Sequence, residues 1–423
     1  MRFDTLDDWL SWQQTLHAKK IDLGLERVRE VLCRLGILQP EYRILTVAGT
    51  NGKGSTVALC ANILGAAGYR VGTFTSPHLF HYRERTTIAG QNLDDAQIVT
   101  LFDLVDQARG ATSLTYFEFA FVAAALAFSG ANIHVAILEV GLGGRLDAVN
   151  ALDADAAVVV SVALDHTGWL GEDREAIGFE KAGVFRAQRP AVVADPDPPK
   201  SVIDYASCID ASLRQVGQAF HWQVDSERPH WRYWDDYWDL QDLPLPAGQG
   251  DYWLANAAGA LALVSSVRGK LPVPTAAIAA GLSKPGPRGR LERHLINHAE
   301  WIFDVAHNPH GTAALARALL PLPSGRSYAL VAVMADKDIL AMLRELHTIV
   351  DEWWVSSAGT ERGAEPSLVA QHLTQLGVDT VRVSPDLATA LSELRLLAGR
   401  GDRVVVFGSF HTVGPALEYL GLY

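Results

Sequence analysis

The alternation of apolar and polar segments along the chain predicts strands and helices in turn. Apolar runs of the β type cover residues 43–48, 70–75, 133–140 and 156–163. Between them, apolar residues with helical spacing occupy residues 55–67, 93–108 and 117–129. Strands that alternate with helices of this length form mainly parallel sheets, because each helix returns the chain to the edge where the next strand starts. We therefore expect an α/β fold.

A second alternating series follows a stretch rich in proline and glycine at residues 284–290. Its expected strands are residues 300–304, 328–334, 352–356, 380–383 and 403–407. A chain of 423 residues is long enough for two or three domains. The pattern predicts a large domain at residues 1–284, a linker at 285–295 and a smaller domain at 296–423.

An aromatic segment at residues 221–240 has two possible roles. Its aromatic side chains could stack on nucleic-acid bases; these are Trp231, Tyr233, Trp234, Tyr237 and Trp238. Acidic residues lie among these aromatic residues, so a packed β-hairpin or the edge of an insert is the favoured interpretation.

Composition narrows the possible partners. The net charge is −12, which argues against a general surface for nucleic acid or anionic membrane. The three cysteines, 33, 60 and 208, have no C-x-x-C spacing and indicate a reducing compartment. The longest apolar run, 119–128, is far short of the roughly 20 residues that a membrane span needs. With no signal peptide at residues 1–4, we expect a cytoplasmic protein.

The stretch TVAGTNGKGST, residues 46–56, has the context of a phosphate-binding loop, with a strand before it and a helix after it. Its glycines allow backbone N–H groups and the helix dipole to converge on an anion, and Lys53 adds a full positive charge. Val47 replaces the first glycine of the strict P-loop pattern, and Gly54 stands where a hydroxyl should follow the lysine. Ser55 or Thr56 must supply that hydroxyl. A glycine-rich turn with a chance lysine is the alternative.

Three further residues are candidates for chemistry. Glu139 ends an apolar strand, at the edge where open α/β sheets bind ligands. It is either a structural acid or, beside a phosphate loop, a Mg²⁺ ligand. His166 follows another strand, although imidazole is not the usual ligand of Mg²⁺. Lys181 is either a surface lysine or a buried lysine with a lowered pKa.

A series of motifs in both halves of the chain resembles the bacterial folylpolyglutamate synthase/dihydrofolate synthase family of the Mur ligase superfamily. In order, these are AGTNGKGST, TSPHL, TYFEF, LEVGLGGRLDAVN, LDHTGWLG, EKAGV, GRLE and DVAHNPHG. The glycine loop is shared with Mur ligases, whereas TSPHL and LDHTGWLG are typical of the folate enzymes. The resemblance implies an N-terminal P-loop ATPase domain with a mainly parallel sheet and a smaller, Rossmann-like C-terminal α/β domain.

The resemblance also implies the site residues. The ATP contacts would be Gly52, Lys53, Gly54, Ser55, Asn256, Arg290 and Asp304. The ligands of Mg²⁺, with two ions expected, would be Ser76, Glu139 and His166. The pterin substrate would be held by Asp22, Leu23, Gly24, Leu25, Thr115, Tyr116, Phe117, Glu118, Leu146, Asp147 and Ala148. Lys181 matches a carbamylated lysine of the family, and Lys53, Lys181 and His166 are the catalytic candidates. Val305 stands where relatives often have glycine.

The activity implied is ATP-dependent ligation of L-glutamate to dihydropteroate, which forms dihydrofolate, and to reduced folylpolyglutamates, through an acyl phosphate. The partners expected are these small molecules, without nucleic acid or membrane, and the chain is expected to be a monomer. Two alternatives stay open. A Mur-type ligase would add an amino acid to a UDP-muramyl acceptor, and a nucleotide-gated regulatory or partner-binding P-loop protein would need no glutamate.

Overall fold

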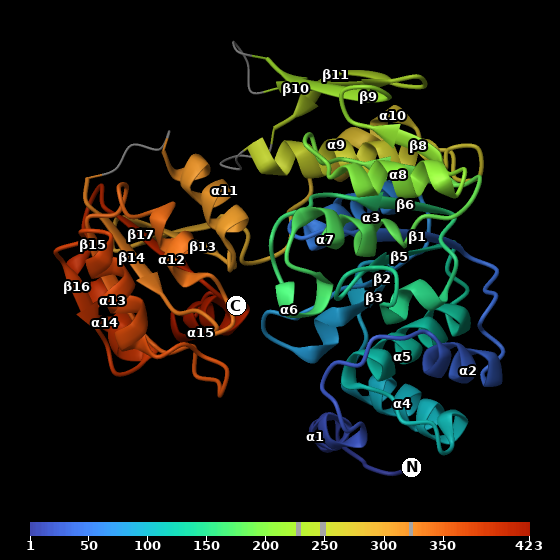
Figure 1. The fold of residues 1–423 in the computed structure, drawn as a ribbon, viewed down its shortest axis with the longest axis horizontal. Helices are drawn as coiled ribbons and strands as arrows, with labels where there is room; N and C mark the ends of the chain where they lie inside the picture. Colours follow the sequence, from blue (N-terminus) through green and yellow to red (C-terminus); the bar gives the residue numbers. More distant parts are fainter. Residues whose placement is uncertain (226–229, 246–250, 321–324) are drawn as a thin grey trace. The chain divides into compact units, whose positions relative to one another are not determined.

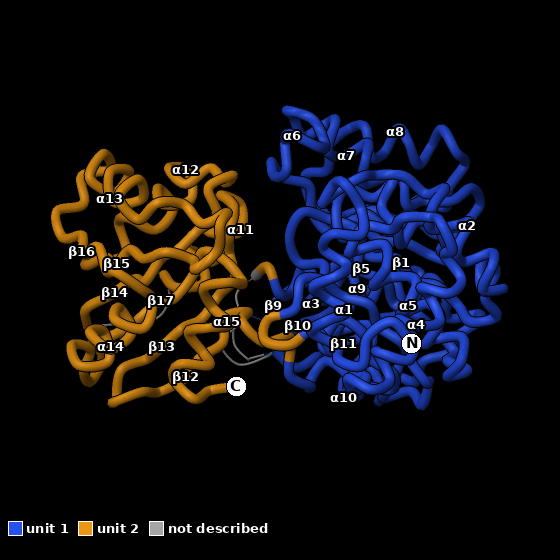
Figure 2. Tube along the Cα trace, turned by 90° about the horizontal axis from the view of Figure 1, so that it is seen from below, with its two compact units in different colours: residues 1–78, 82–246, 253–285 blue, residues 79–81, 247–252, 286–423 orange. Residues whose placement is uncertain are grey.

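The computed structural model describes residues 1–225, 230–245, 251–320 and 325–423 of the chain. The chain divides into two compact units, which Figure 2 shows in blue and orange. Unit 1 comprises residues 1–78, 82–246 and 253–285, and unit 2 comprises residues 79–81, 247–252 and 286–423.

A mainly parallel sheet forms the centre of unit 1 (Figure 1). Within the described residues it has eight strands in the order β4-β3-β2-β5-β1-β6-β7-β8. The strands are β1 (Arg43–Ala48), β2 (Val71–Phe74), β3 (Thr86–Ile88), β4 (Gln91–Asn92), β5 (Val135–Glu139), β6 (Ala156–Val159), β7 (Pro190–Val193) and β8 (Ser212–Gln215). Among the described strands of this sheet, β3 pairs antiparallel with both β2 and β4 at one edge, and the other neighbours are parallel. The predicted α/β class is confirmed.

Helices cover this sheet. Alternate residues of β5 point to the same face of the sheet and pack against a helix there. Ala136 and Leu138 belong to the same core cluster as Phe121 and Phe128 of α5. The helices are α1 (Leu6–Leu16), α2 (Glu26–Arg34), α3 (Lys53–Ala66), α4 (Asp95–Arg109), α5 (Tyr116–Gly130), α6 (Thr167–Leu170), α7 (Arg174–Ala182), α8 (Lys200–Cys208), α9 (Asp251–Ser266) and α10 (Thr275–Leu282), with 3₁₀ turns η1 (Tyr82–Arg85) and η2 (Ala148–Ala151). None of the helices in the described ranges has the length and apolar character to cross a membrane.

The aromatic segment forms part of a small antiparallel sheet. Its strands are β9 (Phe220–Val224), β10 (His230–Asp235) and β11 (Asp239–Pro244). Trp231 and Tyr233 are only 1% and 0% exposed, so they pack inside the protein and are not available to stack on bases. The predicted packed hairpin is confirmed for β10 and β11, while residues 226–229 of the segment lie outside the described residues.

Unit 2 is built on a second sheet, with the strand order β12-β13-β17-β14-β15-β16 in the described residues. The strands are β12 (Glu292–Ile296), β13 (Ala299–Asp304), β14 (Ser327–Val331), β15 (Glu352–Val355), β16 (Val381–Val383) and β17 (Arg403–Phe407). All neighbours are parallel except β12 and β13. Its helices are α11 (Pro309–Leu319), α12 (Ile339–Arg344), α13 (Pro366–Gln375), α14 (Leu387–Leu397) and α15 (Phe410–Tyr419). The sheet begins at Glu292, inside the segment expected as a linker.

A short segment far from the rest of unit 2 in sequence also belongs to it. Leu79 and Phe80 pack against the core cluster that contains Val413. The backbones approach so closely that a Cβ atom on Gly414 would lie 2.3 Å from Leu79 O. Residues 79–81 are thus part of unit 2, although the residues before and after them belong to unit 1.

Candidate functional site

The glycine loop between β1 and α3 has the backbone geometry of an anion-binding loop. Gly52, directly before α3, has a φ of 83°, a left-handed conformation that glycine adopts without steric cost. A Cβ atom there would lie 2.2 Å from Asn256 Oδ1, so α9 contacts the loop and leaves no room for a side chain. Thr50 N–H donates to Ser161 O, and Thr50 Oγ1 bonds to the backbone of Ala163. These bonds fix the loop at the N-terminus of α3, where the helix dipole attracts anions.

The loop presents a cation, Lys53, and a hydroxyl, that of Ser55. Lys53 Nζ donates to two carbonyl groups of its own loop, at 3.0 and 3.1 Å. Thr56 Oγ1 donates to Gly52 O at 3.0 Å, a bond within the helix. Ser55 Oγ makes no hydrogen bond with the described residues. Of the two hydroxyls that the sequence left open, Ser55 is therefore the better candidate for a ligand contact.

Glu139 lies at the C-terminal end of β5, directly beside this loop. Its side chain is 5% exposed. A Cβ atom on Gly54 would be 3.6 Å from Glu139 Oε2, and the same oxygen accepts a hydrogen bond from Ser76 N–H at 3.1 Å. The structure thus brings two of the three predicted metal ligands, Ser76 and Glu139, together at the glycine loop.

His166, the third predicted ligand, precedes α6. Its backbone is left-handed, with a φ of 51°, and its Nε2 lies 4.0 Å from Asp165 Oδ1. Among the described residues, no three His, Cys, Asp or Glu side chains come together as a metal cage. Mg²⁺ does not need such a cage, since it commonly takes one or two carboxylates together with phosphate oxygens and water. The carboxylate of Glu139 beside a phosphate-binding loop fits this ion.

Lys181, in the last turn of α7, is a buried lysine. It is 4% exposed and makes no hydrogen bond or ion pair with the described residues. Burial and the charge of Lys53 lower the pKa of its amine to about 7, against the opposing effect of Asp165 and Asp147. A large fraction of the amine is therefore neutral at physiological pH. Of the two interpretations that the sequence allowed, the surface lysine is wrong.

Glycines bring Lys181 to the site, a role that the sequence analysis missed. The loop after β5 packs on the end of α7, where Arg145 N–H donates to Glu180 O at 2.8 Å. A Cβ atom on Gly144 would lie 2.8 Å from Glu180 O, and one on Gly183 would lie 2.4 Å from Arg145 Cβ. The small residues in GLGGR and EKAGV were the available signal, because glycine lets a loop and a helix approach closely.

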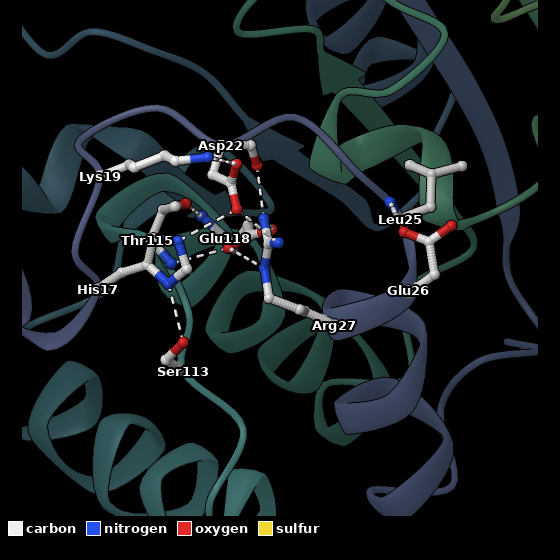
Figure 3. Close-up of polar contacts among 9 residues, drawn as sticks. All are labelled: His17, Lys19, Asp22, Leu25, Glu26, Arg27, Ser113, Thr115 and Glu118. Atoms are coloured by element: carbon white, nitrogen blue, oxygen red, sulfur yellow. Dashed lines mark hydrogen bonds and ion pairs between the residues drawn. The ribbon is translucent and has the colours of Figure 1, made fainter.

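The three predicted pterin-binding segments lie together in unit 1, joined by polar contacts. Figure 3 shows Arg27 between two of them, with Nη1 donating to Asp22 Oδ2 and Nη2 to Glu118 Oε1, both at 2.8 Å. His17 Nε2 and Lys19 Nζ also contact the Asp22 carboxylate, at 3.2 and 3.1 Å. The third segment joins through Gly24 N–H, which donates to Leu146 O at 3.1 Å.

Two of the predicted substrate contacts have structural tasks. Glu118, 4% exposed in its side chain, forms a capping box with Thr115 at the start of α5. Both oxygens of Asp147 accept backbone hydrogen bonds, from Leu142 N–H at 2.8 Å and Val149 N–H at 3.1 Å. Burial raises the pKa of Asp147 to about 7 in spite of these bonds. The T-x-x-E pattern of the capping box was visible in the sequence, whereas Arg27 had no local signal.

A separate open cavity of about 360 Å³ lies beside the first of these segments, at Leu25. Leu25, Asn150 and Arg186 are among its lining residues, but Lys53, Glu139 and Lys181 are not. It is therefore not the place where the candidate chemical groups meet.

The predicted ATP contacts Arg290 and Asp304 belong to unit 2. Asp304 ends β13 and accepts hydrogen bonds from Leu291 N–H at 2.9 Å and Ala306 N–H at 2.8 Å. Burial raises the pKa of Asp304, while the charge of Arg290 opposes this shift. Val305, where relatives often have glycine, is 2% exposed and donates its N–H to Gly289 O, so the loop accommodates the side chain.

Comparison with known proteins identifies both halves of the chain. The model of the Mur ligase middle domain matches residues 47–264, and the model of the Mur ligase, glutamate ligase domain matches residues 289–410. The dihydrofolate synthase/folylpolyglutamate synthase of Escherichia coli K12 is 42% identical over 418 residues, which cover 98% of this chain and 95% of the relative.

Solved structures agree with the whole architecture. E. coli FolC in complex with DHPP and ADP aligns with a TM-score of 0.93 at 42% identity, over 99% of this chain and 98% of that one. A bifunctional folylpolyglutamate synthase/dihydrofolate synthase with Mn, AMPPNP and L-glutamate bound aligns with a TM-score of 0.91 at 42% identity, over 99% and 98% of the two chains.

The Arg27 network predicts a change in stability. Replacement of Arg27 by Met leaves the buried Glu118 carboxylate without its cation, and we expect unit 1 to lose about 2–3 kcal/mol of unfolding free energy. Urea unfolding measures this loss. In the double variant with Glu118→Gln the two effects should be strongly non-additive, whereas Lys200→Met, which breaks an exposed pair with Asp204, should cost less than about 0.5 kcal/mol. Additive effects of Arg27→Met and Glu118→Gln would show that the pair is not coupled.

Proposed function

Because the chain belongs to the Mur ligase family, as a dihydrofolate synthase/folylpolyglutamate synthase that ligates glutamate to dihydropteroate and folates with ATP, we propose that it works through an acyl phosphate made beside the Lys53 loop. The observation that carries the proposal is the position of Lys53 and the Glu139 carboxylate at the same loop, on the ligand-binding edge of the unit 1 sheet. The sequence identity of 42% to the E. coli dihydrofolate synthase/folylpolyglutamate synthase, over 98% of this chain, favours this activity over that of a UDP-muramyl ligase and over a regulatory P-loop protein.

The chemistry follows from the weakness of a carboxylate as an acyl donor, since its leaving group would be oxide. An oxygen of the pterin carboxylate attacks the γ-phosphorus of ATP, and ADP leaves. The amine of glutamate then attacks the acyl carbon and loses a proton, and phosphate departs. Such a transfer needs positioning and charge neutralisation more than covalent help from the protein. Lys53 supplies a cation for the phosphates.

The substrates would be held by the residues that match the family motifs. In unit 1 the nucleotide would be held by Gly52, Gly54 and Ser55 of the phosphate loop and by Asn256 beside it. In unit 2 the residues for the nucleotide would be Arg290 and Asp304. The pterin is bound by the segments 22–25, 115–118 and 146–148. Arg27 holds the first of these segments against the second.

A divalent metal fits the donor set of the site, and Mg²⁺ is the ion we propose, with two ions per chain. Glu139 supplies a carboxylate, Ser76 a hydroxyl and His166 an imidazole. When bound, the metal would neutralise the charge of the transferred phosphoryl group.

We also propose that Lys181 acts as a carbamate. Its neutral nitrogen attacks CO₂ and loses a proton, which replaces a cation by an anion. The buried amine, its lowered pKa and its lack of a hydrogen-bond partner in the described residues support the proposal. An ammonium beside a metal would repel it, whereas a carbamate would attract it.

The substrate prediction is tested by ATP turnover with dihydropteroate, reduced folates and UDP-muramyl peptides in parallel, each with and without L-glutamate. We expect glutamate-dependent ADP release with the first two only. Lys53→Ala should abolish it while the urea unfolding midpoint stays within error. Ordinary turnover in the Lys53→Ala variant would exclude the phosphate-loop assignment.

The metal prediction concerns Glu139. Glu139→Gln should raise the Mg²⁺ concentration for half-maximal activity by at least about 10-fold or eliminate turnover, because an amide is a much weaker ligand for a hard cation. Titration with Mn²⁺, followed by its EPR signal, should show the same loss of affinity without reliance on activity. Glu30→Gln, on the exposed face of α2, is the matched control. An unchanged Mn²⁺ affinity would remove Glu139 from the metal site.

The carbamate prediction depends on pH. Because the pKa of Lys181 is about 7, most of the amine is neutral at pH 8, while at pH 6 only about one tenth is neutral and able to react with CO₂. In ¹³C-bicarbonate, the protein should show a carbamate ¹³C resonance at pH 8 that weakens as the pH falls to 6. Lys181→Arg should lack the resonance and be inactive, since guanidinium stays protonated.

Chemical rescue provides a second test of the carbamate. Lys181→Ala should be severely impaired and should regain part of its activity in high concentrations of acetate or formate, whose carboxylate replaces the anion. Near-normal activity of Lys181→Arg would establish that Lys181 acts as an ordinary cation.

A further inference from the structure

Arg85 is a buried cation that the proposed reaction has not used. It ends η1 and is 8% exposed. Its Nε donates to His78 Nδ1 at 3.0 Å. Arginine has five N–H donors, and no acceptor among the described residues takes a hydrogen bond from the other four. The two terminal nitrogens are not among the fully buried atoms that lack a partner, so they keep some exposed surface.

Two tyrosine rings hold the guanidinium group in place. Its central carbon lies 5.4 Å from the ring centroid of Tyr82 and 5.4 Å from that of Tyr116. The two rings meet edge to face at 6.0 Å and an angle of 89°. Burial raises the pKa of both phenols, and the charge of Arg85 only partly opposes this shift. Both tyrosines therefore stay neutral, and neither supplies an anion for Arg85.

The position of Arg85 connects two parts of the candidate site. Its backbone carbonyl accepts a hydrogen bond at 2.9 Å from the N–H of Thr75, the residue before Ser76. Its side chain lies against Tyr116, the first residue of α5 and part of a segment assigned to the pterin. Arg85 thus lies where the loop that carries Ser76 meets a pterin-binding segment.

A buried charge is normally paired, because an unpaired one is costly in a medium of low dielectric constant. The two tyrosine rings compensate for only part of this cost. A planar guanidinium with free N–H groups matches a carboxylate, which it binds through two parallel hydrogen bonds. We propose that Arg85 binds the carboxylate of the pterin substrate and orients it for phosphorylation. This inference rests on the proposed function, since that carboxylate is the group to which glutamate is added.

Binding without catalysis tests the proposal most directly. Dihydropteroate and its anilino analogue, which has the same rings without the carboxylate, are titrated into the protein in the absence of ATP and glutamate. The wild type should prefer dihydropteroate. Arg85→Ala should bind dihydropteroate roughly 10- to 100-fold more weakly and the analogue with unchanged affinity. The unchanged affinity for the analogue would also show that the site remains folded.

Two further variants separate charge from geometry. Arg85→Lys keeps a cation between the rings but cannot form the paired hydrogen bonds, so it should recover only part of the preference. Added guanidinium ion at low concentration should restore part of the preference in Arg85→Ala. Arg83→Ala, an exposed position on the same 3₁₀ turn, should behave as the wild type.

Steady-state kinetics distinguish a failure of this inference from a failure of the proposed function. Glutamate-dependent turnover of dihydropteroate by the wild type tests the function itself. If it is present, Arg85→Ala should raise the KM for dihydropteroate and leave the KM for ATP and for glutamate unchanged. Equal weakening of both pterin ligands, no weakening, or a change confined to the KM for glutamate would overturn the assignment of Arg85.

Discussion

The candidate site depends on how buried charge is compensated at the C-terminal edge of the unit 1 sheet. Parallel strands bring the half-buried Lys53 and the buried Glu139 and Asp147 to this edge. The backbone provides part of the compensation: carbonyl groups of the loop accept from Lys53, and N–H groups donate to Glu139 and Asp147. These bonds let ionisable groups be buried without a dense set of side-chain ion pairs.

The buried polar groups fall into two sets according to whether the protein itself satisfies them. Glu118 and Asp147 have all their close partners within unit 1, and they fix the loops that surround the site. Ser55, Lys181 and Arg85 keep donors without an acceptor in the described residues. A folded protein usually avoids such groups, so unsatisfied donors of this kind are expected where a protein binds ligands.

More of the fold than of the contacts within the site could be predicted from the sequence. The apolar pattern located β1 to the residue. The motif order singled out the glycine loop and Glu139, which the structure places side by side, because these signals are local. Residues 156–163 were expected as one strand, but β6 ends at Val159 since Ser161 and Ala163 bond to Thr50 of the glycine loop instead of a neighbouring strand. Arg27, Arg85 and the contact of Asn256 with Gly52 depend on residues distant in sequence, and no local pattern announces them.

The assignment of residues 79–81 to unit 2 has a consequence for the way the chain can be divided. A fragment that starts at Gly286 would contain every strand of the second sheet, yet Leu79 and Phe80 would be missing from its core. The apolar surface that they cover near Val413 and Gly414 would be exposed to water and would favour aggregation. Expression of the glutamate ligase domain by itself therefore requires either a tethered copy of this short peptide or polar substitutions at the surface that it covers.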